Sequence, residues 1–400
     1  QIMSNRRDFV KNSILVTAGI AGLGSAASVY GTTCRKVNPS DKFRVALIGG
    51  RNRGWSNLET FLKFPQVDCV SLCDIDNEWL YKRAADTEKI SGRRPSQIVK
   101  DWRRVMDNQD VDAVIIATPD HWHCLQAIAA MEAGKDVYCE KPLTLTIEEG
   151  RVLLKAARRY RRIVQTGSQQ RSDAKFHAGC EMVRAGRIGK IHTVRVGLPG
   201  VNWTKDPLTP DSEPPTELDY DLWLGPAPWR AYNKQRVHYY FRFFWDYSGG
   251  QMTNWGAHHL DIAQWGLGMD ESGPVEIQAT GTYDREKRFE VPESFKITYK
   301  YANGVTILCD SPSKKTGTVF EGDKGTIFVN RGVLESNPQE IADEALQRIG
   351  QAPKFKSHHQ NWLECIKSRQ LPVCDVAIGH RSATVCHLGN IAVRTGKTIK

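Results

Sequence analysis

Short apolar segments alternate with helix-period segments through the first half of the chain, and this alternation constrains the fold more than any other feature. The strand-like segments span residues 43–48, 67–73, 113–117, 137–139 and 163–166. The helix candidates between them span residues 79–89, 102–106, 124–133 and 147–160. Such alternation is typical of a parallel sheet with helices on both faces. The sequence therefore predicts an α/β fold that begins with a doubly wound parallel sheet.

The pattern changes after Gly167. A helix candidate at 174–185 and an alternating strand at 190–196 precede a Pro- and Trp-rich region, 199–228, with little periodicity. Further strands are expected around residues 275–283, 295–301, 305–309 and 326–329. The Asn303-Gly304 pair is a strong hairpin signal, because both residues tolerate positive φ. Antiparallel strands after a parallel sheet predict a second, α+β domain with an open, largely antiparallel sheet.

These changes divide the chain into parts. The expected parts are a signal segment at 1–34, a linker at 35–41, a parallel-sheet domain at 42–167, an α+β domain at 168–355 and C-terminal helices at 356–400. The two C-terminal helices are expected at 358–366 and 378–393, packed back on the body. An exposed sheet face in the second domain would favour a homodimer or homotetramer.

The first residues are typical of an export signal rather than of a folded domain. Arg6 and Arg7 precede a weakly apolar run, 13–29, that is rich in Gly and Ala and short for a membrane span. This looks like a twin-arginine signal, whose pathway exports folded proteins. We therefore expect a periplasmic protein whose mature form has no transmembrane anchor. The alternatives are a disordered basic tail and lipid attachment at Cys34.

The ten cysteines do not form the pattern of a disulfide framework. Cys69 and Cys73 lie four apart on a predicted strand, which separates their Cα atoms by about 13 Å, beyond the reach of a disulfide. Cys124, Cys139 and Cys309 lie in apolar runs, where a free thiol acts as a small core residue. Free cysteines are therefore expected in spite of export.

The formal net charge of +10 is spread along the chain. The one dense basic run, 158–162, ends a helix candidate, where cations interact favourably with the helix dipole. No basic stripe interleaved with aromatic residues accompanies it, which argues against a nucleic-acid partner.

The first strand ends in Gly49-Gly50-Arg51-Asn52-Arg53-Gly54. A dinucleotide-binding turn has glycines at its first, third and sixth places, and here Arg51 replaces the third. Asp74 stands twenty residues beyond Gly54 at the end of the next strand, where a carboxylate binds the adenosine ribose. Asp74 favours NAD over NADP, although Arg51 and Arg53 have the chemistry to bind a further phosphate. The alternative is that Asp74 caps the following helix.

Polar residues also follow two later strands, in Thr118-Pro119-Asp120-His121-Trp122-His123 and in Glu140-Lys141-Pro142. Ligands of open parallel sheets bind outside the carboxyl ends of the strands, so both segments should face the same crevice as the glycine turn. Partial burial would lower the pKa of Lys141 and let it act as acid or base for a sugar hydroxyl. The alternative is an ordinary lysine in a surface turn.

From Phe43 to the C-terminus the chain resembles the glucose-fructose oxidoreductase, inositol dehydrogenase and MocA (Gfo/Idh/MocA) family. The likeness rests on the glycine turn, Thr118-Pro119 with His123, Ala133-Gly134-Lys135 before Glu140-Lys141-Pro142, and Gly249-Gly250 followed by Gly256, His258 and Asp261. It implies a Rossmann domain, an open-faced α/β domain, NAD(P), and oxidation of a carbinol on a sugar or cyclitol. It also implies that Lys141 and His258 are catalytic. The cofactor-binding residues are then Gly49, Arg53, Gly54, Asp74, Thr118, Pro119, His123, Glu140 and Lys141.

One position departs from the family pattern. Four residues before the histidine, where the family often has an aspartate, this chain has Asn254. Asn254 and His258 are expected on one helix face as i and i+4, but an amide cannot exchange protons. Proton handling then rests on His258 and Lys141, and Asn254 orients a hydroxyl. The alternative is that His258 is a satisfied core histidine, although His259 or Asp261 could equally be the structural member.

Three further residues are expected to contact substrate: Arg171, Tyr247 and His259. Tyr247 belongs to an aromatic region, 223–247, whose rings are suited to sugar C–H faces. His121 and His123 together with His258, His259 and Asp261 have metal-ligand chemistry, but the two groups lie far apart in the sequence and the resemblance offers no metal. We expect no metal site.

The resulting hypothesis is an NAD-dependent oxidoreductase acting on a sugar or glycoside. An exported enzyme is expected to hold its cofactor tightly and to recycle it, because free NAD is scarce outside the cytoplasm. One alternative is an NAD-dependent glycosidase or lyase that oxidises the ring transiently and then eliminates the leaving group. A second alternative is a non-catalytic relative that binds sugar.

Overall fold

The computed structural model describes residues 42–203, 206–349 and 357–400. The expected signal segment 1–34, the linker 35–41 and the question of Cys34 all lie outside these residues. Within them, no helix is both long enough and apolar enough to cross a bilayer. The nine cysteines in the described residues are all buried and free, as the sequence predicts.

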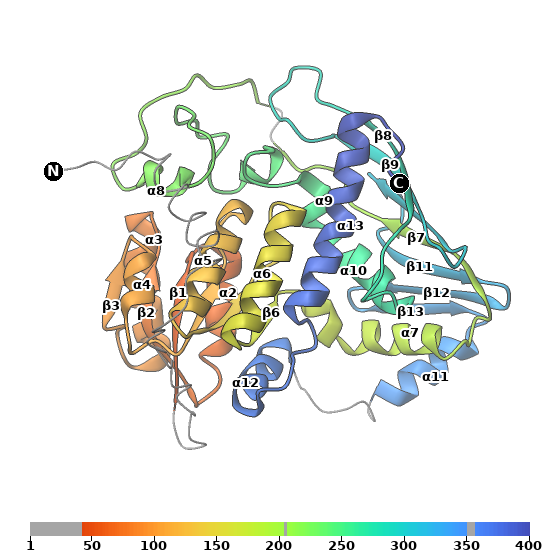
Figure 1. Ribbon diagram of the computed structural model, residues 1–400, viewed down its shortest axis with the longest axis horizontal. Helices are drawn as coiled ribbons and strands as arrows, with labels where there is room; N and C mark the ends of the chain where they lie inside the picture. The colour runs from red at the N-terminus through yellow and green to blue at the C-terminus, as the bar shows by residue number, and fades with distance from the viewer. Residues whose placement is uncertain (1–41, 204–205, 350–356) are drawn as a thin grey trace, which may run out of the picture.

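The first domain contains a six-stranded parallel sheet in the order β3-β2-β1-β4-β5-β6 (Figure 1). Its strands are β1 (Phe43–Ile48), β2 (Val67–Cys73), β3 (Gln97–Val99), β4 (Ala113–Ile116), β5 (Asp136–Cys139) and β6 (Val164–Thr166). Its helices are α2 (Asn52–Phe61), α3 (Asn77–Ser91), α4 (Arg103–Asp107), α5 (Asp120–Glu132) and α6 (Ile147–Tyr160). The predicted doubly wound sheet is confirmed. The edge strand β3 was missed, because it has only two apolar residues and none of its three residues is buried.

Alternate residues of the central strand enter different cores. Val45 and Leu47 pack with apolar residues of α2, α3 and the C-terminal helix α12 (His358–Ser368). Ala46 and Ile48 pack with apolar residues of α4, α5 and α6. Both faces of the sheet are therefore covered, and a ligand can reach the strands only at their ends.

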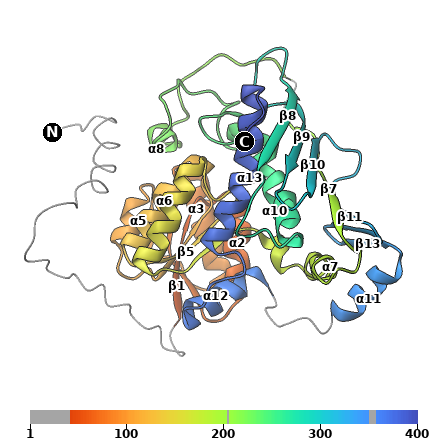
Figure 2. The same cartoon turned by 45° about the vertical axis from the view of Figure 1, so that its right-hand side comes forward.

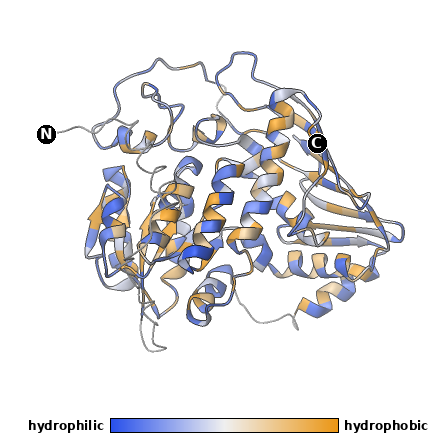
Figure 3. Cartoon of the chain, in the orientation of Figure 1, coloured by the Kyte–Doolittle hydropathy of each residue, from blue (hydrophilic) through white to orange (hydrophobic). Residues whose placement is uncertain are grey.

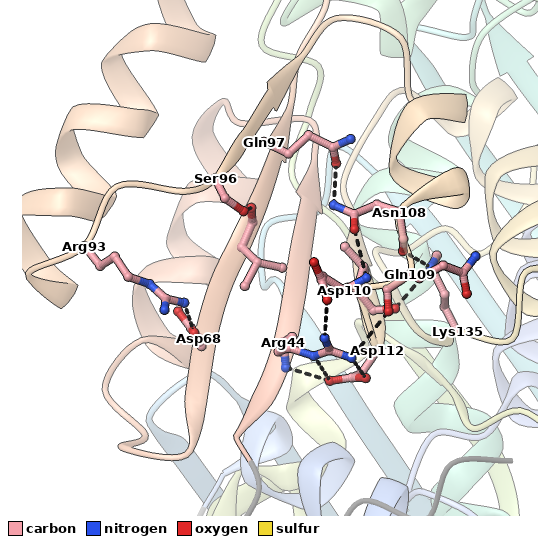
Figure 4. A network of polar contacts seen from close by, with 12 residues as sticks. Arg44, Asp68, Arg93, Ser96, Gln97, Asn108, Gln109, Asp110, Asp112 and Lys135 are labelled. Atoms are coloured by element: carbon pink, nitrogen blue, oxygen red, sulfur yellow. Dashed lines mark hydrogen bonds and ion pairs between the residues drawn. The ribbon is translucent and has the colours of Figure 1, made fainter.

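The amino edge of this sheet is closed by a polar network (Figure 4). The Arg44 guanidinium of β1 donates to both carboxylate oxygens of Asp112, at 3.0 and 2.8 Å. The buried Lys135 ammonium donates to the backbone oxygens of Asn108, at 2.7 Å, and Val111, at 3.1 Å. These contacts bind the turns before β4 and β5 to β1, which leaves the carboxyl edge for a site.

The second domain contains a seven-stranded sheet in the order β13-β12-β11-β7-β10-β9-β8. Its strands are β7 (Ile191–Gly197), β8 (Glu276–Thr282), β9 (Ser294–Lys300), β10 (Thr306–Ser311), β11 (Gly317–Gly322), β12 (Gly325–Asn330) and β13 (Val333–Asn337). The Asn303-Gly304 hairpin joins antiparallel β9 and β10, as predicted, and only β7 and β10 pair in parallel among these strands. Sequence reasoning missed β11 and β13, whose polar residues weaken the strand pattern.

Helices cover one face of the second sheet and connect it to the first domain. They are α7 (Ala174–Arg184), α10 (Gly256–Gly266) and α13 (Val376–Thr395), with α11 (Glu340–Arg348) beside α7 and α12 (His358–Ser368) under the first domain (Figures 1 and 2). The two predicted C-terminal helices are confirmed as α12 and α13. Figure 3 shows apolar residues along the strands of both sheets and along α13, which contacts α6, α10 and β8.

Arg171 lies at the junction of these elements. It belongs to the short helix η1 (Gln169–Ser172), is 2% exposed, and forms ion pairs with Asp261 of α10 at 2.8 Å and with Asp270 at 2.6 Å. The Ser382 hydroxyl of α13 also donates to Asp261. The predicted substrate contact does not fit this placement, because two carboxylates already use the guanidinium. Arg171 instead connects the end of the first domain to α10 and α13.

Substituting Arg171→Met should destabilise the protein by about 3–5 kcal/mol, because it leaves two carboxylates without their buried counter-charge. Urea unfolding measures this loss as a change in the free energy of unfolding. Arg94→Met is the matched control, because Arg94 makes an exposed pair with Glu88. A loss in the Arg171 variant no greater than in this control would show that the junction does not depend on the ion pairs.

Candidate functional site

A cavity opens where the carboxyl ends of β1, β2, β4 and β5 meet the region 222–254 of the second domain. Its walls contain nearly all of the predicted cofactor residues: Gly49, Arg53, Asp74, Thr118, Pro119, His123, Glu140 and Lys141. The second domain contributes Trp223, His238, Tyr239, Arg242, Ser248 and Asn254, among others. The structure therefore brings the three predicted loop segments together at one edge of the sheet.

Two positions of the glycine turn, Gly49 and Gly54, have no room for a side chain. A Cβ atom on Gly49, whose φ is +91°, would lie 2.7 Å from the Ala117 oxygen, and one on Gly54 would lie 1.8 Å from the Gly49 oxygen. Helix α2 begins directly after Arg51, and no side chain caps its first turn. Its free backbone N–H groups and the positive end of its dipole are suited to an anion such as a pyrophosphate.

Asp74 at the end of β2 is a buried carboxylate, 8% exposed. It accepts hydrogen bonds from the backbone N–H of Gly50, at 2.7 Å, and of Asp76, at 3.0 Å. Burial raises its pKa to about 6, against the effect of these two bonds. The alternative role as a helix cap is wrong, because Asp76 caps α3 by accepting from the Glu78 N–H at 3.0 Å. Asp74 remains available to a ribose hydroxyl through its free lone pairs.

Glu140 after β5 lines the cavity and is held in place by several hydrogen bonds. Its Oε1 atom accepts from Arg53 Nε at 3.1 Å, Asn57 Nδ2 at 2.8 Å and Gln169 Nε2 at 2.9 Å. Burial acts to raise the pKa of Glu140, but Arg53, Asn57 and Lys141 outweigh it and hold that pKa below its ordinary value. The carboxylate therefore stays ionised and ties the Lys141 loop to α2.

Lys141 occupies the cavity wall beside the second domain. Its Nζ atom donates to the backbone oxygen and to the Oδ1 atom of Asn254, both at 3.0 Å. Burial lowers the pKa of Lys141 to about 8, while Glu140 and Asp120 act to raise it. An amine with this pKa is partly neutral near pH 7 to 8 and can act as a general base. A surface turn lysine would have neither the burial nor these partners.

Asn254 and His258 lie on two successive short helices rather than on one. Helix α9 (Gly250–Asn254) ends at Asn254, and α10 begins after Trp255. His258 is 9% exposed, and its Nδ1 atom has no hydrogen-bond partner among the described residues. Burial, and then the charge of Lys141, lower the pKa of His258 well below its ordinary value. The imidazole is therefore neutral, its Nδ1 atom is sealed from solvent, and His258 itself does not line the cavity.

Two of the predicted substrate contacts lie in the core. Tyr247 is fully buried, with its ring 4.7 Å from that of Trp223 and 5.2 Å from that of His121. His259 is fully buried and stacks on Trp255 at 6.1 Å. Neither residue lines the cavity. Tyr247 lies next to the Gly249-Gly250 turn in the sequence. Sequence position alone, however, does not show which aromatic and imidazole rings face the cavity and which pack into the core.

The histidines after β4 fix the backbone. His123 places its Nδ1 atom 2.8 Å from the Pro142 oxygen and its Nε2 atom 2.9 Å from the Thr118 oxygen. His121 Nε2 lies 3.1 Å from the Trp223 oxygen. Among residues 42–203, 206–349 and 357–400, no group of three or more His, Cys, Asp or Glu side chains is arranged to hold a metal ion.

Sequence reasoning missed the part of the second domain that covers the cavity. The Asn77 N–H donates to the Glu217 oxygen at 3.0 Å, and the Asp219 N–H donates to the Ile75 oxygen at 2.9 Å. Trp122 Nε1 also donates to the Trp223 oxygen at 3.1 Å. The region 217–223 is thereby bound across the end of β2 and the start of α5. Its irregular, Pro- and Trp-rich sequence carries no periodic signal that would predict this docking.

Comparison with known proteins identifies both domains. The description "Oxidoreductase family, NAD-binding Rossmann fold" matches residues 43–168. The description "Oxidoreductase family, C-terminal alpha/beta domain" matches residues 172–400. Both descriptions are of Gfo/Idh/MocA domains, so the first domain is an NAD-binding Rossmann domain.

Curated relatives match over part of the chain. A glycosyl hydrolase family 109 protein of Shewanella sp. (strain W3-18-1) is 32% identical over 160 residues, which span 36% of this chain and 35% of the relative. An alpha-N-acetylgalactosaminidase of Shewanella oneidensis is 28% identical over 204 residues, which span 47% of this chain and 44% of the relative. The matches thus cover less than half the length of these relatives.

Solved structures match over most of the chain. Aldose-aldose oxidoreductase from Caulobacter crescentus, complexed with glycerol, has a TM-score of 0.67 and 20% identity, and the match covers 90% of this chain and 99% of that one. The WlbA dehydrogenase from Bordetella pertussis, in complex with NADH and UDP-GlcNAcA, has a TM-score of 0.66 and 20% identity, with 90% and 98% covered. At these identities the likeness shows the shared fold. With both family domains matched in order from residue 43 to residue 400, the chain belongs to the Gfo/Idh/MocA oxidoreductase family.

Proposed function

We propose that this protein oxidises a carbinol of a sugar or glycoside with NAD. The observation that carries the proposal is the Lys141 amine, which burial makes a base near neutral pH and which Asn254 holds in the wall of the cavity. The same cavity contains the glycine turn and Asp74. A base and a dinucleotide site in one cavity are the parts that such an oxidation requires.

The residues present fit NAD. A Cβ atom on Gly49 or Gly54 would clash with the backbone, so these two glycines keep the turn tight, and the uncapped start of α2 that follows is suited to a pyrophosphate. Asp74 would accept a hydrogen bond from the adenosine ribose, and its charge would repel a 2′-phosphate. NAD supplies the hydride acceptor when bound. The region 217–223 docked across the first domain favours a cofactor that is held tightly and recycled.

The proton steps rest on residues of this chain. Neutral Lys141 takes the proton from the substrate hydroxyl at its Nζ atom. The two oxygens of Asn254 hold that atom in place, each 3.0 Å away. The neutral His258 imidazole, whose pKa is lowered by burial and by the charge of Lys141, is the second candidate to hydrogen-bond a substrate oxygen.

A second candidate function is an NAD-dependent glycosidase or lyase that oxidises the sugar ring, eliminates the leaving group and restores the cofactor. Two observations favour it: Asn254 stands where the family often has an aspartate, and the chain is 28% identical over 204 residues to an alpha-N-acetylgalactosaminidase. A non-catalytic sugar-binding protein is the third candidate, and the lowered pKa of Lys141 speaks against it.

We further propose a role in carbohydrate metabolism after export to the periplasm by the twin-arginine route, which Arg6, Arg7 and the apolar run 13–29 support.

We also propose a homodimer or homotetramer. The side chains on the face of β9 away from the helices, such as Lys296 and Lys300, are exposed, and an open sheet face of this kind is available to a second copy.

The proposal predicts that the purified protein carries NAD, which mass spectrometry of the nucleotide released on denaturation would identify. With a panel of nitrophenyl glycosides and free sugars, the oxidoreductase should accumulate a keto-sugar. The glycosidase would instead release nitrophenol without net formation of NADH. A protein without nucleotide that also fails to bind added NAD would contradict both.

Activity should rise with pH through the pKa of Lys141, about 8, because the neutral amine is the form that accepts the proton. Lys141→Met should lower kcat by about 10²- to 10⁴-fold, the contribution typical of a general base, with a smaller change in KM. Steady-state kinetics and pH–rate profiles test this. Retention of wild-type kcat in Lys141→Met would remove Lys141 from the mechanism.

Gly54→Ala should lose the bound nucleotide, because the new methyl group would lie 1.8 Å from the Gly49 oxygen and distort the turn. The nucleotide-to-protein ratio of the purified variant measures the loss, and we expect it to fall at least tenfold. Gly273→Ala is the control, since a Cβ atom there meets open space. Full occupancy in Gly54→Ala would place the nucleotide elsewhere.

A further inference from the structure

Asp120 is a buried carboxylate that the proposed proton steps leave unused. It is the first residue of α5 and is 5% exposed. Its side chain lies in the wall of the same cavity as Lys141 and Asn254. Sequence reasoning included Asp120 in the segment after β4 and gave it no role. Its position directly after the carboxyl end of a parallel strand could have indicated that it belongs to the site.

The contacts of Asp120 leave one carboxylate oxygen open. The Ser248 hydroxyl donates to its Oδ2 atom at 2.5 Å. Within the described residues the Oδ1 atom accepts no hydrogen bond, and it is not one of the atoms sealed from solvent, so it faces the cavity. Ser248 directly precedes the Gly249-Gly250 turn, from which α9 runs to Asn254. Asp120 and Lys141 are therefore both bonded to the same short stretch of the second domain.

The charges around Asp120 are mostly positive. His123 lies on the same helix, and Lys141 and Arg242 share the cavity wall, while Glu149 of α6 is an acidic neighbour. Burial raises the pKa of Asp120, and His123, the Ser248 bond, Lys141 and Arg242 oppose this rise. The positive end of the α5 dipole also favours the ionised carboxylate. A carboxylate in these surroundings is a counter-charge for a nearby cation.

Lys141 lacks such a counter-charge among its direct partners. Asn254 offers two oxygens that orient the Nζ atom, but an amide carries no charge. The other carboxylate, Glu140, acts more strongly on the pKa of Lys141 than Asp120 does, but Glu140 also binds Arg53, at 3.1 Å, and its charge is shared between the two cations. When Lys141 accepts a proton, it becomes an ammonium in a site whose burial disfavours the charged form.

We propose that Asp120 is the positioning residue that balances the charge of protonated Lys141, a task that Asn254 cannot perform. The inference rests on the proposed function. The proton leaves the substrate hydroxyl and forms a bond with Lys141 Nζ, and Asp120 stays ionised throughout, as the buried aspartate does in a Ser-His-Asp triad. An aspartate at position 254 could both orient the Lys141 amine and balance its charge. In this chain Asn254 orients the amine, and Asp120 balances the charge.

The test is the pH dependence of Lys141 acetylation, measured on the full-length purified protein with trace acetic anhydride and quantified by peptide mass spectrometry. Wild type should show a midpoint at about 8. Asp120→Asn, which keeps the shape of the side chain and an acceptor for Ser248, should lower the midpoint by about one pH unit, because an opposite charge nearby shifts a pKa by that amount. Asp120→Ser, which is smaller, should give the same shift and serves if the amide variant does not fold.

A second arm restores the charge at position 254. Asn254→Asp in the Asp120→Asn background should return the midpoint at least to the wild-type value, because the new carboxylate lies against Nζ. In pH–rate profiles, Asp120→Asn should move the acid limb of kcat to lower pH and reduce its plateau. A purely structural role would lower the plateau without moving the limb.

Asp343→Asn is the matched control, because Asp343 is exposed on α11 and its side chain accepts a hydrogen bond only from Gln339 among the described residues. An unchanged midpoint in a folded Asp120 variant, an equal shift in the control, or no recovery in the double variant would overturn the inference. Acetylation needs no sugar, so a shifted midpoint would stand even if the protein oxidised none. If the protein oxidises a sugar but the midpoint of Lys141 acetylation is the same in the Asp120 variants as in wild type, the proposed function stands and only the role of Asp120 is overturned.

Discussion

The site depends first on the buried carboxylate of Glu140. One of its oxygens accepts hydrogen bonds from Arg53 and Asn57 of α2 and from Gln169 of η1. These donors come from the helix that follows the glycine turn and from the first residues after the parallel sheet. A hydrogen-bonded, charge-paired carboxylate is costly to break inside a protein, so the loops that it joins hold one arrangement. The position of the neighbouring Lys141 is a consequence of this arrangement.

The second domain supplies hydrogen-bond partners for the side chains that the first domain places in the cavity. Lys141 makes two hydrogen bonds to Asn254, and Asp120 accepts one from Ser248, so all three bonds cross between the first domain and the second. The region 217–223 is bound over the same edge of the sheet. Farther in, Arg171 joins η1 to α10 and α13 through Asp261, Asp270 and Ser382. The cavity is therefore a product of the interface between two domains, and its electrostatics follow from burial there.

Some of this was predictable from the sequence for identifiable reasons. The strands β1 and β2 and the helix α6 were predicted with their observed bounds, because their apolar residues follow the period of the element strongly. The loops after the strands were expected at one edge, because parallel strands share a direction. Arg171, Tyr247 and His259 were assigned to substrate by their positions, and the structure places them in ion pairs or in the core. Burial of a single side chain depends on elements distant in the sequence, which no local pattern reports.

The sequence by itself determined the order of the elements, the parallel sheet, the glycine turn and the presence of Lys141 after β5, because each follows from local periodicity and residue chemistry. Only the tertiary structure decided that Lys141 is held by Asn254, that His258 is neutral and that Asp120 lies in the same cavity wall. The physical reason is that a pKa and a charge balance depend on solvent exclusion and on neighbours across an interface. The partners across that interface, Asn254 for Lys141 and Ser248 for Asp120, are more than a hundred residues away along the chain and come together with them only when the two domains pack.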